Sequence, residues 1–311
     1  MAKILITESV HPIGPELLTA AGHTVVYADR DMDVIRREIV DADAVLVRII
    51  ELPGSLLATA KNLKIVSKHG VGYDNIDLDY CKSRGVAVTI TPNANSLSVA
   101  EHAFTLMLTL AKNIIPVSNE YRTVGFAAKN HAPGIEMTGK TLGLVGMGRI
   151  GKHILHMCRD GLDMHVIVYD PYISEVPEGV EKVDDLSELL RRADVVTLHC
   201  LLTDETRKLI DRERLALMKP TALLINCARG PIVDEAALIE ALESGRLAGA
   251  GLDVTDPEPV APDSPLFKLP NVIVTPHYAP TTVESATRVS KIAAENINAV
   301  LAGQEPVGRI V

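Results

Sequence analysis

Short apolar runs rich in β-branched residues alternate with longer mixed segments along the whole chain. Such runs are typical of strands that crossover helices bury on both faces, as in parallel sheets. The predicted strands are 4–7, 24–28, 44–49, 63–68 and 86–90 in a first series, and 141–146, 165–170, 194–200, 222–227, 250–254 and 272–277 in a second. The pattern therefore predicts an α/β protein built on two groups of strands.

Segments with helical spacing lie between the two series of strands and near the end of the chain. A helix is predicted at 98–113, where Ser98 and Glu101 have the S-x-x-E spacing of a capping box and the residues that follow are apolar nearly all round. Residues 114–139 have no clear periodicity, and 131–140 has the composition of a connector. Residues 284–302 have helical spacing with few helix breakers.

Length, charge and cysteine usage narrow the class of protein. A chain of 311 residues exceeds the size at which one core usually keeps growing, which favours two domains. The net charge of -9 disfavours nucleic acid or an anionic membrane as a partner. The four cysteines form no C-x-x-C pair and no metal-ligand spacing, and no apolar stretch is long enough for a membrane span. We therefore expect a cytoplasmic protein with reduced thiols, no metal and no membrane segment.

A glycine-rich loop follows the first strand of the second series. Gly146, Gly148 and Gly151 have G-x-G-x-x-G spacing between a predicted strand and a helical stretch. Glycines there permit a tight turn and close backbone approach to a pyrophosphate, and the helix N-terminus offers unpaired N–H groups. The alternative is a phosphate loop spanning Gly146 to Lys152, but His153 stands where its magnesium-binding Ser or Thr should be.

Asp170 ends the next strand, nineteen residues past Gly151. A carboxylate at this place can accept hydrogen bonds from an adenosine ribose, and it would repel a 2'-phosphate. The alternative is an ordinary turn aspartate before Pro171. Together with the glycine loop, Asp170 favours NAD over NADP.

Polar residues follow three consecutive strands of the second series. Arg229 lies just past the strand at 222–227, Asp253 and Glu258 follow the next one, and His277 ends the last. Ligands of open parallel sheets bind at the carboxyl ends of the strands, so these side chains can converge. Arginine can hold a carboxylate bidentately, histidine can exchange a proton near neutral pH, and a glutamate can orient and charge its ring. These groups suit oxidation of a 2-hydroxy acid, although each alone is more often a solvated surface residue.

With these residues the chain resembles the D-isomer-specific 2-hydroxyacid dehydrogenases, the family that includes D-3-phosphoglycerate dehydrogenases and glyoxylate or hydroxypyruvate reductases. The resemblance covers essentially the whole length, through GKTLGLVGMGRIGK, NCARGPIVDEAAL, AGLDVTDPEP and VTPH, with HGVGYDNID as substrate loop and NANSLSVAEH as interdomain helix. It implies two doubly wound parallel-sheet domains. A Rossmann NAD-binding domain, 98–280, is inserted into a discontinuous flavodoxin-like substrate domain, 1–97 and 281–311. It also implies a cytoplasmic homodimer.

The resemblance assigns roles to residues. Arg229 binds the substrate carboxylate and polarises the carbonyl, His277 is the acid/base, and Glu258 pairs with the histidine. Arg48, Val71 and Gly72 also bind substrate. The residues expected at the cofactor are Gly146, Gly148, Arg149, Ile150, Gly151, Asp170, Thr206, Cys227 and Asp253. Cys227 is expected to be a wall residue and not a nucleophile, and His199 to have a packing role.

The expected function is an NAD-dependent oxidoreductase that transfers a hydride between NAD(H) and a small D-2-hydroxy acid or 2-keto acid. The alternative is an NAD-responsive binding or regulatory protein on the same fold with little turnover. Departures from the family at Leu201, Tyr278 and Pro280 make the substrate end unusual, and the RIIELP segment after Arg48 lacks the hydroxyl residues expected for a phosphate. Phosphoglycerate is therefore possible but not favoured, and the particular 2-hydroxy acid stays open.

Overall fold

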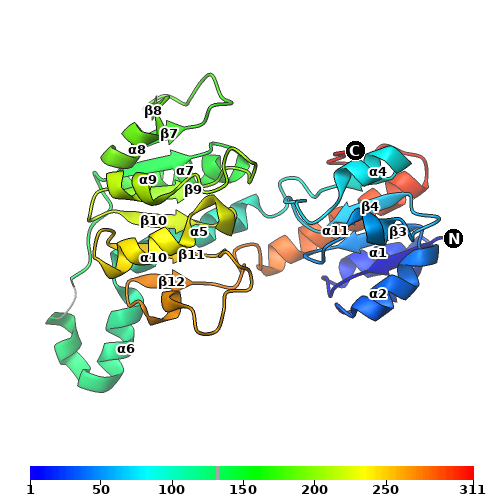
Figure 1. The fold of residues 1–311 in the computed structure, drawn as a ribbon, viewed down its shortest axis with the longest axis horizontal. Coiled ribbons are helices and arrows are strands. Elements are labelled where there is room, and N and C mark those ends of the chain that lie inside the picture. The colour runs from blue at the N-terminus through cyan, green and yellow to red at the C-terminus, as the bar shows by residue number, and fades with distance from the viewer. Residues whose placement is uncertain (131–132) are drawn as a thin grey trace. The chain divides into compact units, whose positions relative to one another are not determined.

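The computed structural model describes residues 1–130 and 133–311, which fold into two compact units (Figure 1). The discontinuous unit consists of Met1–Asn95 with Thr281–Val311, and the continuous unit consists of Ser96–Pro280. Each unit contains a parallel sheet covered by helices. The α/β fold class predicted from the sequence is confirmed.

The discontinuous unit has a five-stranded parallel sheet in the order β2-β1-β3-β4-β5. All five expected strands form: β1 has the expected length but begins one residue earlier, and the other four are shorter by one or two residues. The strands are β1 (Lys3–Ile6), β2 (Thr24–Tyr27), β3 (Ala44–Val47), β4 (Ile65–Lys68) and β5 (Ala87–Thr89), and the helices are α1 (Ile13–Ala20), α2 (Met32–Glu38), α3 (Gly54–Leu57), α4 (Leu78–Arg84) and α11 (Val283–Leu301).

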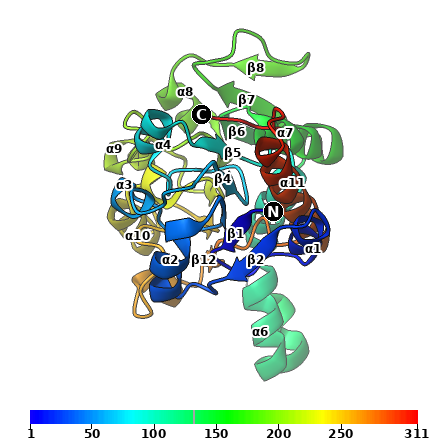
Figure 2. The ribbon, with the colours of Figure 1, turned by 90° about the vertical axis from the view of Figure 1, so that its right-hand side faces the viewer.

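Alternate residues of a strand pack on opposite faces of this sheet. Ile4 and Ile6 belong to the cluster under α1 and α11, whereas Leu5 packs with residues of α2, α3 and α4. Figure 2 shows α1 and α11 side by side on their face. Both faces are therefore buried, which explains the continuous apolar runs at Ile4–Ile6 of β1 and throughout β3.

The continuous unit has a seven-stranded parallel sheet in the order β12-β11-β10-β9-β6-β7-β8. Its strands are β6 (Thr141–Val145), β7 (His165–Tyr169), β8 (Val180–Lys182), β9 (Val195–Leu198), β10 (Leu223–Asn226), β11 (Gly249–Leu252) and β12 (Val272–Val274). Its helices are α5 (Ser96–Ala111), α6 (Ile114–Val124), α7 (Arg149–Leu162), α8 (Leu186–Arg192), α9 (Arg212–Leu217) and α10 (Glu235–Glu243). One face packs against α5 and α7, and the other against α8, α9 and α10. Short 3-10 helices lie at Ile39–Asp41, Gly125–Asn130, Gly230–Ile232 and Pro265–Lys268.

The strand order of the continuous unit reverses direction beside β6. The chain runs outward from β6 through β7 to β8, then returns to β9 on the other side of β6 and runs outward to β12. In open parallel sheets such a reversal marks the ligand crevice at the carboxyl ends of the strands. The residues that follow β6, β9, β10, β11 and β12 are therefore the first candidates for a site.

Three sequence expectations differ from the structure. The capping box is wrong: α5 begins at Ser96, so Ser98 and Glu101 lie inside the helix, where the backbone cannot take the extended conformation of an N-cap. The six strands expected in the second series form, but β8 was missed because its three residues, VEK, carry no apolar run. Helix α6 was also missed, and none of its residues is buried.

The connector expected at 131–140 begins with two residues that lie outside the described part of the chain, and 133–140 contains no helix or strand. The helix expected at 284–302 is confirmed as α11. Within the described ranges, no helix has the length and apolar character needed to cross a membrane.

Candidate active site

The glycine loop joins β6 to α7 and depends on its glycines for close packing. Gly146 has a φ of +89°, and a Cβ there would lie 2.8 Å from the backbone nitrogen of Cys200. A Cβ at Gly151 would lie 2.4 Å from the carbonyl oxygen of Gly146. At Gly148, by contrast, no described atom lies within 4 Å of the Cβ position. The loop is therefore packed tightly on the protein side and open at Gly148, as close approach of a ligand to the backbone requires.

Helix α7 begins directly after this open glycine. Its N-cap is Gly148, which has no side chain to accept hydrogen bonds from the first turn. Six other helices receive such a bond from the side chain of Asp31, Asp77, Asp185, Asp211, Asp234 or Thr282. The N–H groups and the positive dipole end of α7 therefore remain suited to binding an anion. In the first turn of α7, Arg149 is exposed and Ile150 is partly buried against the core. These features fit a dinucleotide pyrophosphate.

Asp170 lies directly after β7 and connects two parts of this region. Its Oδ2 accepts a hydrogen bond of 2.9 Å from the N–H of Met147 in the glycine loop, and its Oδ1 accepts one of 3.0 Å from the N–H of Tyr172. Asp170 is thus brought to the glycine loop as expected. Thr206 lies in the loop after β9, where its hydroxyl donates to the carbonyl of Leu201 at 2.6 Å and accepts from the N–H of Thr203 at 2.7 Å.

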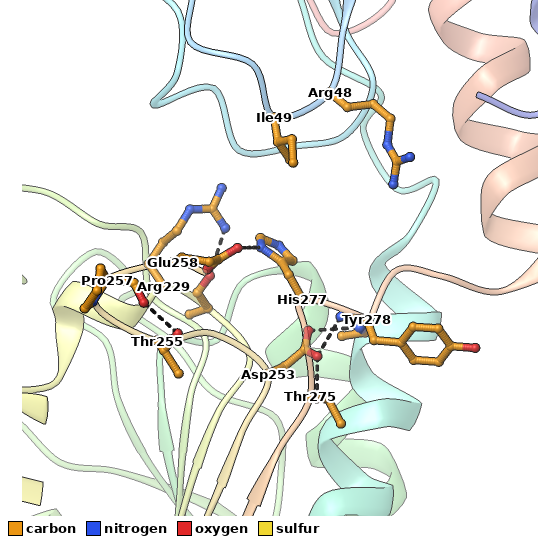
Figure 3. A network of polar contacts seen from close by, with 12 residues as sticks. Arg48, Ile49, Arg229, Asp253, Thr255, Pro257, Glu258, Thr275, His277 and Tyr278 are labelled. Atoms are coloured by element: carbon orange, nitrogen blue, oxygen red, sulfur yellow. Dashed lines mark hydrogen bonds and ion pairs between the residues drawn. The ribbon is translucent and has the colours of Figure 1, made fainter. Parts of the chain in front are cut away.

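His277 and Glu258 are paired. The Nδ1 atom of His277 lies 2.6 Å from Oε1 of Glu258, and both side chains are partly exposed (Figure 3). His277 has a φ of +52°, a left-handed backbone conformation that is costly for a residue with a Cβ. The surrounding structure must hold this conformation, and strain of this kind often accompanies a functional position.

Arg229 follows β10 on a turn that two neighbours shape. The side chain of Asn226 accepts from the N–H of Ala228 at 3.0 Å and donates to the carbonyl of Arg229 at 2.9 Å. A Cβ at Gly230 would lie 1.9 Å from the carbonyl oxygen of Thr255, so the Arg229 turn lies against the segment that leads to Glu258. Figure 3 shows Arg229, Glu258 and His277 gathered from three strand ends. The structure therefore brings together the three residues predicted for catalysis.

Asp253 is almost completely buried, with 1% of its surface exposed. Its Oδ1 accepts from the hydroxyl of Thr275 at 2.5 Å and from the N–H of Tyr278 at 2.7 Å, and its Oδ2 accepts from the N–H of Ala279 at 2.9 Å. Burial acts to raise the pKa of Asp253, but hydrogen bonds from His102, Thr275 and the two backbone N–H groups outweigh it, so the pKa is lowered. The Asp253 carboxylate is therefore ionised and lies against the segment that contains His277.

Sequence reasoning missed four residues that shape this region: His102, Asn226, Gly230 and Thr275. The Nε2 atom of His102 lies 3.0 Å from Oγ1 of Thr275 and 3.4 Å from Oδ1 of Asp253. All four lie within the motifs that carry the family resemblance, but those motifs assigned them no role. The contacts of His102, Gly230 and Thr275 join segments far apart in the chain, and Asn226 acts only through the turn that its side chain bonds.

Cys227 and His199 lie where strands β10 and β9 end. Burial, with a smaller contribution from the charge of Asp253, raises the pKa of the Cys227 thiol well above its usual value, so the thiol stays protonated. The Nε2 atom of His199 lies 2.8 Å from Oγ1 of Thr197, and its buried Nδ1 has no hydrogen-bond partner among the described residues. Burial lowers the pKa of His199 to about 3, so its ring is neutral at ordinary pH.

The remaining predicted site residues, Arg48, Val71 and Gly72, belong to the discontinuous unit. Arg48 follows β3, and its Nη1 donates to the carbonyl of Ser9 at 3.1 Å. The loop that Arg48 opens is held by the buried carboxylate of Glu8, which accepts from the N–H groups of Arg48 and Ile49 at 2.7 Å each. Val71 and Gly72 are half-buried in the loop between β4 and α4.

The fold and the site define a dinucleotide-binding protein with a histidine–glutamate pair and an arginine at neighbouring strand ends. Residues 104–279 match the NAD binding domain of the D-isomer specific 2-hydroxyacid dehydrogenases. The chain belongs to this family.

Two relatives and one solved structure illustrate the similarity. The D-3-phosphoglycerate dehydrogenase of Methanocaldococcus jannaschii is 42% identical over 98% of this chain, which spans 58% of that protein's length. The glyoxylate reductase of Thermofilum pendens is 38% identical over 98% of this chain and 93% of its own length. The NADPH-dependent glyoxylate/hydroxypyruvate reductase of Sinorhizobium meliloti, solved with NADP and malonate, is 28% identical with a TM-score of 0.90, covering 100% of this chain and 97% of that one. The cofactor of this family is a nicotinamide dinucleotide.

Proposed function

We propose that the protein catalyses reversible hydride transfer between NAD(H) and a small D-2-hydroxy acid or its 2-keto acid. The observation that carries the proposal is the 2.6 Å contact between His277 Nδ1 and Glu258 Oε1, beside Arg229 at the strand ends of a dinucleotide-binding sheet. Reduction of a ketone needs a proton for the oxygen, and oxidation needs a base for the same proton. A histidine held by a carboxylate can do both.

Each of the three residues has a separate task in this proposal. A bound nicotinamide supplies or accepts the hydride. Arg229 holds the substrate carboxylate through its planar guanidinium and polarises the carbonyl. Glu258 occupies Nδ1 of His277, so Nε2 is the atom that donates a proton to the carbonyl oxygen in reduction and takes it back in oxidation. Glu258 also fixes the orientation of the imidazole ring through this contact.

The preferred cofactor in this proposal is NAD. Asp170 supports it, because its carboxylate lies beside the glycine loop, where a 2'-phosphate would meet like charge. Replacing Asp170 with Ala should weaken NADH binding and relatively improve NADPH. Measurement of kcat/KM with both cofactors tests this, and a wild-type preference for NADPH would remove the ribose assignment.

In this proposal residues 98–280 form the NAD-binding domain, and residues 1–97 with 281–311 form the substrate-binding domain. Arg48, Val71 and Gly72 would contribute to substrate binding, with backbone N–H groups at Val71 and Gly72 receiving the carboxylate. We favour an unphosphorylated substrate, because Ile49 and Ile50 follow Arg48 where hydroxyl groups would serve a phosphate.

The proposed assembly is a cytoplasmic homodimer. Helix α6 supports a homodimer because none of its residues is buried and Ile114, Ile115, Tyr121 and Val124 are 44 to 60% exposed, an apolar surface of the kind that pairs with another chain. All four cysteines are free thiols, as a reducing compartment favours. Sedimentation of the wild type and of Tyr121→Asp tests the dimer, which the substitution should dissociate.

A turnover screen with several 2-keto acids and NADH tests the function. We expect reduction to fall and oxidation to rise as the pH increases, because reduction uses the charged imidazole and oxidation the neutral one. His277→Ala should lower turnover about 100- to 10,000-fold while NADH binding largely survives. Lack of turnover with every substrate, combined with NADH binding, would favour the regulatory alternative. Normal turnover by His277→Ala would instead remove the histidine from the chemistry.

A further inference from the structure

The segment from Thr275 to Ala279 is held by one buried carboxylate. Asp253 accepts a hydrogen bond from the Thr275 side chain before His277, and from the N–H groups of Tyr278 and Ala279 after it. The N–H of His277 donates to the backbone carbonyl of Asp253 at 2.8 Å. Asp253 thus contacts the chain on both sides of a residue whose φ is +52°. These bonds offset the cost of that backbone conformation.

His102 on helix α5 completes the arrangement. The hydroxyl of Thr275 donates to Asp253, so its oxygen accepts from Nε2–H of His102 at 3.0 Å. This assignment fixes the tautomer of His102 with the proton on Nε2. The same Nε2 lies 3.4 Å from Oδ1 of Asp253, and the ring of His102 meets the ring of Tyr278 edge-on at 6.2 Å between centroids. His102 therefore contacts the 275–279 segment on both sides of His277, at Thr275 and at Tyr278.

We propose that His102 is a positioning residue, which through Thr275 and Asp253 holds the 275–279 segment so that the His277 ring stays aligned with Glu258. The proposal rests on the proposed acid/base role of His277. His102 lies 17% exposed on a helix that packs on β10 and β11, so it fixes the segment to the rigid part of the continuous unit. Rigid support of this kind is needed because misplacement of a reacting group by about 1 Å can cost about 100-fold in rate.

The experiment compares His102→Phe, which removes the donor, with His102→Gln, whose amide offers an N–H near the position of Nε2. We expect His102→Phe to lower kcat about 10- to 100-fold while the dissociation constant of NADH changes less than about 2-fold, and to raise the solvent deuterium isotope effect on kcat. His102→Gln should recover most of the loss. Thr105→Val, an exposed position on the same helix, is the matched control and should behave as wild type.

A second arm tests the pathway through Thr275. Thr275→Val removes the hydroxyl and should resemble His102→Phe, whereas Thr275→Ser should resemble wild type. The double variant His102→Phe/Thr275→Val should lose little more than either single variant, because both break one connected set of bonds. A crystal structure of His102→Phe should show the His277 ring displaced from Glu258, a result independent of turnover.

Three outcomes separate the hypotheses. If His102→Phe keeps the wild-type kcat and isotope effect while His277→Ala loses turnover, the positioning role is refuted and the proposed function stands. If His102→Phe and His102→Gln lose thermal stability and kcat equally, without a change in isotope effect, His102 is structural only and the inference also fails. If His277→Ala itself retains turnover, the failure belongs to the proposed function.

Discussion

His199 makes the stability of the continuous unit depend on pH. Its ring is buried, with no hydrogen-bond partner for Nδ1 in the part of the chain that the structure describes, and its pKa falls from 6.5 to about 3 on folding because burial disfavours the charged form. A group whose pKa is lowered on folding contributes stability that is present above its unfolded pKa and is lost as the pH falls. The affected interval is therefore pH 6.5 down to 3.

The size of the loss follows from the same two values. Between about pH 7.5 and about pH 5, a histidine that titrates at 6.5 when unfolded and at about 3 when folded lowers the free energy of unfolding by about 2 kcal/mol. The backbone of His199 packs against the glycine loop, because its carbonyl oxygen lies 2.9 Å from where a Cβ at Gly146 would stand.

The assay is amide hydrogen exchange of β9 and β10 at the two pH values, because a chain of two units need not unfold in one transition. His199→Gln keeps a group that can bond to Thr197 and cannot titrate, so it should lose about 2 kcal/mol less than wild type over the interval. His165→Gln, at an exposed position of β7, is the control and should follow the wild type. Equal losses in wild type and His199→Gln, or an NMR titration of His199 centred near its ordinary value, would refute the reasoning.

Three further predictions concern the site. Arg229→Lys should lose activity on every 2-keto acid that wild type accepts, because a point charge cannot reproduce bidentate geometry; unchanged kinetics would exclude Arg229 from substrate binding. Gly230→Ala should lower kcat/KM at least about 10-fold, because its Cβ would lie 1.9 Å from the carbonyl oxygen of Thr255 and must push apart the segments that carry Arg229 and Glu258; wild-type values would argue against this role. Cys227 should resist iodoacetamide at neutral pH because its raised pKa leaves little thiolate, and rapid alkylation there in a mass spectrum would contradict that.

The sequence predicted those elements of the fold whose formation leaves a pattern in neighbouring residues. Apolar, β-branched runs marked eleven strands, among them the fully buried β3, β9 and β10, whereas β8 has no apolar run and α6 has no buried residue. The capping box failed because S-x-x-E spacing also occurs inside a helix, and only the backbone distinguishes the two positions.

The residues of the site also fall into those that the sequence predicted and those that it could not predict. Glu258 and His277 could be proposed as partners because parallel strands end at one edge of a sheet, and the structure brings them into contact. The supporting residues could not be found, because His102 acts on Asp253 and Thr275 only after α5 packs on the sheet. Likewise, Gly230 is needed for an approach of two backbones that the sequence does not reveal.

The return of the chain to the discontinuous unit has a consequence for synthesis on the ribosome. Ala293, Ala294 and Ile297 of α11 are fully buried in the cluster that contains Ile4 and Ile65, and the carbonyl of Ala293 accepts a bond of 3.0 Å from Ser67. The five strands of the discontinuous unit, which precede α11 in translation, therefore have one face covered only by α1 until residues 283–301 emerge. The continuous unit has all its strands before that point. A nascent chain arrested after residue 280 should resist protease within Ser96–Pro280 and be cut within Met1–Asn95, so the segment made first is the last to become stable.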